Sequence, residues 1–127
     1  MKSLSPFTRF RLEKRIGEYK DFHLGADNAY PLAGVTYLVD YGDIGGYVAE
    51  DGADLDLFVG GKEDGFVGYI RVARPELKSG ETKVYIDLSE TEEAAVLTAF
   101  QLVLLSYGRY ASYDELMRAI APFKVSA

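Results

Sequence analysis

Hydrophobic and polar residues alternate along several short segments in the first two thirds of the chain. In Phe10–Ile16 and Thr82–Leu88 one parity is apolar and the other is mostly polar, which is the pattern of a strand with one buried face. The other segments are short apolar runs bounded by turns. The pattern predicts five strands: Phe10–Ile16, Thr36–Asp40, Leu55–Val59, Phe66–Ala73 and Thr82–Leu88. A helix that begins at Ser5-Pro6 is the alternative for the first of these segments.

After Ser89 the spacing of apolar residues changes to three and four. Ser89 and Glu92 form a capping box, which predicts a helix that continues to Gly108. The apolar stripe of this helix is Leu97, Phe100, Leu104 and Tyr107. Ser112 and Glu115 repeat the box and predict a second helix. Its stripe is Leu116, Ile120 and Phe123, and Pro122 ends it.

Short strands followed by two helices predict an α+β fold in a single domain that spans residues 1–127. Eleven of the 13 glycines lie between Gly25 and Gly80, so the strands are small and interrupted by turns. Sheets of this kind commonly protect their edges by closing. We therefore expect a closed or strongly curled, antiparallel-rich β-barrel with the two C-terminal helices packed outside.

The composition narrows the class of function. Asp and Glu number 20 against 14 Lys and Arg, a net charge of -6, which argues against a nucleic-acid partner. With no cysteine and with His23 as the single histidine, a bound metal would be held by oxygen, which favours Mg²⁺, Mn²⁺ or Ca²⁺. The longest apolar stretch, Ala94–Tyr107, is shorter than a membrane span and no signal-peptide pattern is visible. We expect a cytoplasmic protein without a membrane partner.

Three carboxylates, Asp51, Asp54 and Asp56, enter a predicted strand through a Gly turn. Asp54 and Asp56 are two residues apart, so they share one face of an extended strand. Neighbouring carboxylates repel one another unless a cation lies between them, so the segment suits a hard cation. A solvated acidic hairpin turn is the alternative, because Asp and Gly are frequent in turns for backbone reasons.

The run YGDIGGYVAEDGADLDLFVG, which begins at Tyr41, resembles the signature region of soluble inorganic pyrophosphatases. In that family a Tyr-Gly-x-Ile-like segment precedes Asp-Gly-Asp-x-x-Asp and an apolar strand. Tyr41, Asp51 and Asp56 fit this pattern. Further segments are similar to the family in the same order: Phe10–Gly17, Gly65–Arg74 and Gly80–Val84.

The resemblance implies a small β-barrel and hydrolysis of pyrophosphate, or of a related phosphoanhydride, with Mg²⁺ or Mn²⁺. Asp51 and Asp56 would be catalytic carboxylates that hold metal. The candidate metal ligands are Asp51, Asp54, Asp56 and Glu81. The candidate phosphate-binding residues are Tyr41, Lys83, Tyr107, Arg109 and Lys14. For Lys14, a solvated strand face that also carries Arg15 is the alternative.

Two departures from the family predict that hydrolysis is weakened or lost. The middle carboxylate of the family falls at Ala53, and the aspartate before the phosphate-binding lysine falls at Thr82. Each lost ligand removes stabilisation of the transition-state charge. The alternative function is a non-catalytic acidic module that binds a basic protein partner. Association with a second copy is left open.

Overall fold

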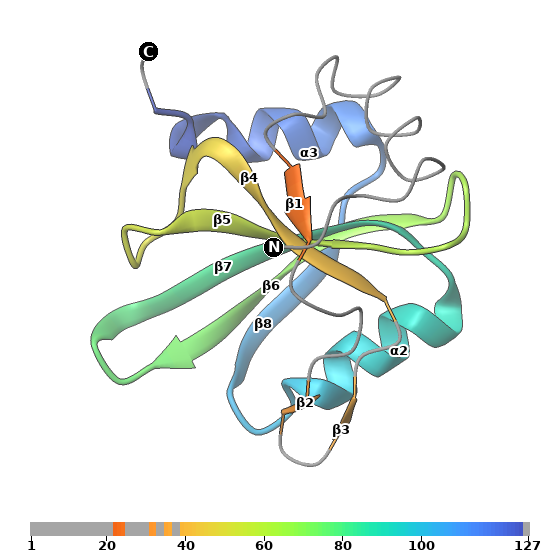
Figure 1. Ribbon diagram of the computed structural model, residues 1–127, viewed down its shortest axis with the longest axis horizontal. Helices are drawn as coiled ribbons and strands as arrows, with labels where there is room; N and C mark the ends of the chain where they lie inside the picture. The colour runs from red at the N-terminus through yellow and green to blue at the C-terminus, as the bar shows by residue number, and fades with distance from the viewer. Residues whose placement is uncertain (1–21, 25–30, 33–34, 37–38, 126–127) are drawn as a thin grey trace.

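The computed structural model describes residues 22–24, 31–32, 35–36 and 39–125. The predicted strand Phe10–Ile16 and the candidate Lys14 lie outside these residues. The described elements form one mixed sheet, one small hairpin and two helices (Figure 1). The sheet has the strand order β1-β4-β5-β7-β6-β8, with bounds β1 Phe22–Leu24, β4 Asp40–Val48, β5 Asp54–Val59, β6 Phe66–Arg74, β7 Leu77–Leu88 and β8 Leu104–Arg109.

The sheet is antiparallel-rich, as predicted, and only its β5–β7 pair runs parallel. The separate hairpin pairs β2 (Pro31–Leu32) with β3 (Val35–Thr36). The predicted closure into a barrel is not found in the described part of the chain, where β1 and β8 are the two edges of an open sheet. The described fold is therefore α+β with an open sheet.

The two helices pack on opposite faces of the sheet, which gives three layers (Figure 1). On one face, α3 (Tyr113–Ile120) packs Leu116 and Ile120 against a core that includes Leu57 and Ile86. On the other face, α2 (Glu90–Ala99) packs Val96 into a second core. A 3₁₀ turn at Ala121–Phe123 follows α3. We call the face of the sheet that α2 covers the α2 face.

Both helices begin where the capping residues predict. Ser89 Oγ accepts the N–H of Glu92 at 3.1 Å, and Glu92 Oε1 accepts the N–H of Ser89 at 2.8 Å. Ser112 Oγ accepts the N–H of Glu115 at 3.1 Å, whereas the Glu115 carboxylate accepts the N–H of Ala111. Each hydroxyl satisfies a backbone donor of the first turn.

The first predicted helix is wrong beyond its third turn. α2 ends at Ala99, and Leu104–Arg109 forms β8, antiparallel to β6. An apolar run of this length fits the period of a helix or of a strand. Pairing with β6 satisfies a row of backbone groups that β6 would otherwise leave without strand partners, and this long-range gain decides in favour of the strand.

The predicted strand Thr36–Asp40 is described only at its ends: Thr36 is the last residue of β3, Asp40 is the first of β4, and residues 37–38 lie outside the described residues. The long strand in this region is β4, which continues to Val48. The acidic turn follows it, between Ala49 and Ala53, where the Ala49 N–H donates to the Ala53 carbonyl at 2.8 Å. Strand β5 then carries Asp54 and Asp56. The other three strand predictions overlap β5, β6 and β7.

Candidate functional site

Sheet register places most of the candidate side chains on the α2 face. Asp56, Lys83, Ile70 and Tyr107 follow one another across β5, β7, β6 and β8. Register partners point to the same side of a sheet. The next row in the same face is Tyr41, Phe58, Tyr85, Gly68 and Arg109. Five of the candidates therefore share one surface of the sheet: Tyr41, Asp56, Lys83, Tyr107 and Arg109.

Lys83 lies at the centre of this site. Its side chain is 7% exposed, and its ammonium group contacts Asp56 Oδ2 and lies 2.7 Å from Glu81 Oε2. The nitrogen also lies 5.9 Å from the ring centre of Tyr41 and 5.6 Å from that of Phe100. Burial lowers the pKa of Lys83, but the two carboxylates outweigh burial and raise it overall. Lys83 is therefore held in its charged form.

Glu81 connects Lys83 with the acidic turn. Its side chain is 2% exposed, and its Oε1 accepts a hydrogen bond from Arg74 Nη1 at 3.1 Å. Burial raises the pKa of Glu81, and a hydrogen bond with the Asp51 carboxyl raises it further. The same hydrogen bond lowers the pKa of Asp51. The opposite directions of the two shifts make Glu81 the more easily protonated carboxyl group of the pair.

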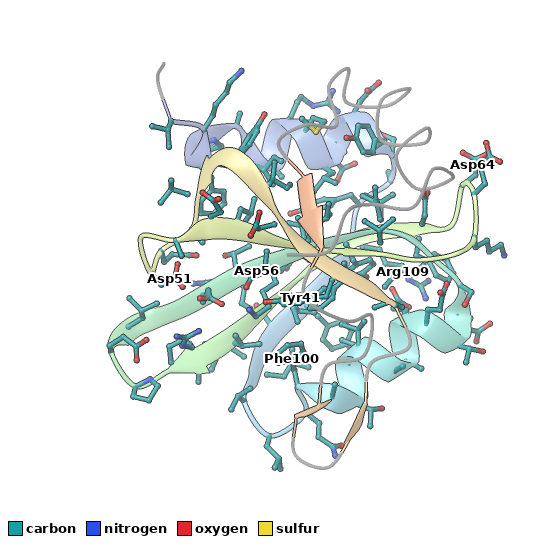
Figure 2. The ribbon with its side chains drawn as sticks, viewed as in Figure 1. Tyr41, Asp51, Asp56, Asp64, Phe100 and Arg109 are labelled. Carbon is teal, nitrogen blue, oxygen red and sulfur yellow. The ribbon has the colours of Figure 1, made fainter. Side chains whose placement is uncertain are left out.

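Asp51 is fixed by its own turn. Its Oδ1 accepts the N–H of Ala53 at 3.0 Å, while the intervening Gly52 has φ of +82°. A positive φ strains residues with a Cβ, which accounts for glycine at this position. Asp51 is exposed, and Figure 2 shows it at the β4–β5 turn, with Asp56 and Tyr41 nearer the centre of the sheet.

The predicted shared face of Asp54 and Asp56 is confirmed. Leu55 and Leu57, which alternate with them along β5, point to the other face and are buried in the core under α3. Asp54 is exposed at the start of β5. Asp56 is bound directly to Lys83. Of the two, Asp56 belongs to the centre of the site.

The two candidates on β8 lie farther from the centre. Tyr107 is 59% exposed and is separated from Lys83 by strand β6, which corresponds to about 10 Å across the sheet. Arg109 donates from Nε and Nη2 to the Glu93 carboxylate, at 3.0 and 2.6 Å. The guanidinium of Arg109 also stacks 3.7 Å from the ring centre of Phe66. The structure does not bring either side chain into contact with Lys83.

Glu93 anchors a second buried group beside this arginine. It accepts a hydrogen bond from the Tyr85 hydroxyl at 2.6 Å, and Tyr85 is 1% exposed. Hydrogen bonds from Arg109 lower the pKa of Glu93, and burial raises the pKa of Tyr85 well above its ordinary range. The hydrogen bond from the neutral Tyr85 hydroxyl to the charged Glu93 carboxylate links α2 to strand β7 of the sheet.

Two residues near the centre were not identified from the sequence as site residues. Arg74 reaches Glu81 from the end of β6, and Glu50 accepts the Thr82 N–H at 2.9 Å and its hydroxyl at 2.7 Å. Side chains alternate along β7, so Thr82 points to the other face of the sheet, whereas Glu81 points to the same face as Lys83. No local signal predicts the Glu50–Thr82 contact, since 32 residues separate the pair.

The charges of the central cluster do not cancel. Arg74 is also bound by Glu76 at 3.1 Å, so the cluster has four carboxylates, Asp51, Asp56, Glu76 and Glu81, against the two cations Lys83 and Arg74. Full ionisation leaves two negative charges. Within the residues that the structure describes, no group of three or more His, Asp or Glu side chains is arranged to hold a metal ion. The donor set is therefore a carboxyl pair, Asp51 and Glu81, next to a carboxylate that Lys83 already neutralises.

The chain matches no protein-family model, no curated protein and no solved structure. In the described part of the chain, no helix has the length and apolar character needed to cross a membrane.

Proposed function

We propose that the cluster around Lys83 on the α2 face binds pyrophosphate or a related phosphoanhydride together with Mg²⁺, and that its hydrolytic activity is weakened or lost. The observation that carries this proposal is a buried, charged lysine between two carboxylates, with Arg74 on the second of them. A phosphoanhydride brings several negative charges, and Lys83 and Arg74 are the cations of this cluster that would contact them.

The carboxyl pair suits a magnesium ion that arrives with the ligand. Mg²⁺ is commonly held by one or two carboxylates and by substrate phosphates, and does not need an all-protein cage. Asp51 and Glu81 supply such a pair, and a divalent cation between them would offset the repulsion between their charges. Mn²⁺ prefers the same oxygen ligands. When bound, the metal would neutralise phosphate charge and lower the pKa of a bound water.

The chain's own residues would have separate tasks. Lys83 and Arg74 would bind phosphate oxygens, and the Tyr41 ring would line the side of the ligand. Asp51 and Asp56 would be the catalytic carboxylates. Weak hydrolysis follows from Ala53, whose methyl group can neither ligate a metal nor accept a proton. Phosphate contacts by Tyr107 and Arg109, a metal contact by Asp54 and a cytoplasmic location remain predictions.

Isothermal titration of pyrophosphate into protein with Mg²⁺ tests binding. We expect Lys83→Met and Asp51→Asn to weaken the affinity at least tenfold, because each removes a direct ligand contact. Asp64→Asn is the matched control, since Asp64 is an exposed carboxylate in the β5–β6 turn, and it should bind like the wild type. Equal affinities in all four proteins would overturn the proposal.

Phosphate release tests hydrolysis separately. A rate for the wild type above that of Asp51→Asn supports residual catalysis through the carboxyl pair. If the wild type binds magnesium pyrophosphate and the two proteins release phosphate at the same rate, the site is a binding site without activity.

A non-catalytic acidic module is the second candidate function. It is favoured by the exposure of Asp51 and Asp54 and by the excess negative charge of the cluster. Such a module should bind a lysine-rich peptide at low salt and release it at about 0.5 M salt, because salt screens surface ion pairs. Tight binding of magnesium pyrophosphate with no binding of the peptide would exclude this alternative.

A further inference from the structure

The strongly exposed apolar side chains of the described residues are concentrated at one edge of the sheet. Of the five large hydrophobic residues that are exposed in the described part of the chain, four fall within one six-residue segment. These four are Leu102 at 79%, Val103 at 37%, Leu105 at 55% and Tyr107 at 59%. Scattered exposure of single apolar residues is normal, but a contiguous patch indicates an interaction surface.

This patch lies on an edge strand that lacks the usual protection. β8 is the last strand in the sheet order, so in the described part of the chain no strand pairs with its outer edge. Edge strands are normally protected by proline or by charged side chains, above all lysine. The sequence from Leu102 to Gly108 contains neither, and the first charge is Arg109. The only irregularity is a register shift near Leu104, and the ladder is regular from Ser106 to Arg109.

Backbone geometry shows which residues face outward. The Tyr110 N–H donates to the Val67 carbonyl of β6 at 2.7 Å. Because hydrogen-bonding direction alternates along a strand, the N–H and C=O groups of Tyr107 and Arg109 point away from β6. An incoming antiparallel strand would therefore pair with these two residues.

The chemistry of this edge favours a second copy of the same chain as its partner. The edge is uncharged apart from Arg109, whose guanidinium is already bound by Glu93, so a strongly basic or acidic partner would gain little here. Two identical edges bring no like charges together when Tyr107 lies opposite Tyr107 and Arg109 lies opposite Leu105. The other edge strand, β1, has three residues and offers a shorter match.

The area also fits a weak symmetric dimer. The four exposed side chains and the strand backbone offer roughly 500 Å² per copy, or about 1,000 Å² in total, which is the lower limit for a specific interface. We propose that β8 pairs with β8 of a second copy across a two-fold axis at Tyr107, which joins the two sheets into one.

The absence of cysteine from the natural sequence permits a direct test of this register. In a hydrogen-bonded antiparallel pair, opposite Cα atoms are about 5.5 Å apart, within the range that a disulfide spans. Mild oxidation of Tyr107→Cys should therefore give a covalent dimer. Arg118→Cys, on the exposed side of α3, is the collision control and should stay monomeric. Equal cross-linking of both variants, or none in either, would overturn the proposed register.

Sedimentation velocity tests the association of the unmodified protein. We expect the wild type to change from monomer to dimer between about 10 µM and 1 mM, as a small interface implies. Leu105→Lys should remain monomeric because it places a charge on the edge. Val125→Lys, which changes an exposed apolar residue outside β8, should dimerise like the wild type. A wild type that stays monomeric at every concentration, or a Leu105→Lys variant that dimerises equally, would overturn the proposal.

Discussion

Replacement of Glu93 by leucine should separate the contribution of a buried hydroxyl from that of an exposed ion pair. Glu93 accepts hydrogen bonds from Tyr85, which is 1% exposed, and from Arg109, whose side chain is 53% exposed. In Glu93→Leu the arginine can turn into water, so its loss should cost little. The Tyr85 hydroxyl, by contrast, stays buried without an acceptor, which costs about 1–3 kcal/mol.

Urea unfolding of a double-mutant cycle measures this cost. Tyr85→Phe alone should lose about 1 kcal/mol, because the hydroxyl and its bond disappear together. The variant that combines both changes leaves no unsatisfied donor, so it should be more stable than the sum of the single losses predicts, by about 1 kcal/mol or more. Glu90→Gln, an exposed glutamate of the same helix, should change stability by less than about 0.5 kcal/mol.

The pH dependence gives an independent check. Hydrogen bonds from Arg109 hold the pKa of Glu93 below its ordinary value of 4.5. A lowered folded-state pKa contributes stability that is present above the ordinary value and is lost as the pH falls through the lowered one. The difference between wild type and Glu93→Leu should therefore shrink below about pH 4.5. Additive single losses, within about 0.3 kcal/mol, would refute the coupling between Glu93 and Tyr85.

Three further outcomes follow from the site and its surroundings. Lys83→Met leaves Glu81 buried without its ammonium partner, so urea unfolding at pH 7 should show a loss of about 2–4 kcal/mol. The loss should be smaller near pH 4, because Glu81, whose pKa is raised, then takes up a proton. Gly68→Ala places a methyl group against the Gly108 carbonyl and the Tyr85 ring, and thermal unfolding should show a cost of about 1–3 kcal/mol. Ala53→Asp restores a carboxylate beside Asp51 and should tighten magnesium pyrophosphate binding about tenfold by calorimetry; unchanged affinity would contradict the proposed ligand site.

The predictions that succeeded depend on interactions close in sequence. The Ser89 and Ser112 caps act within one helical turn, so both helix starts could be predicted from a few residues. The segments Leu55–Val59 and Thr82–Leu88 were both found as strands, although both faces of each strand meet a core, since Phe58 and Tyr85 are buried on the α2 face. The shared face of Asp54 and Asp56 follows from the strand period of two.

The predictions that failed involve a choice between two locally acceptable structures. Leu104 to Tyr107 fits a helical stripe as well as a strand, and the partner that selects the strand is β6, more than thirty residues earlier in the chain. Closure of the sheet is a similar case, because it requires two edges to meet and is not a property of any one segment. In the described residues the edges β1 and β8 stay apart.

For the candidate site, the sequence alone determined an acidic turn at Asp51, an adjacent strand with Asp56 and a lysine at position 83. It did not determine that Lys83 lies between Asp56 and Glu81, or that Arg74 binds the far side of Glu81. The parallel pairing of β5 with β7 brings Asp56 to Lys83, and the antiparallel pairing of β6 with β7 brings Arg74 to Glu81. Local patterns specify which way a side chain points, whereas ion pairs between strands depend on register, which only the packed sheet decides.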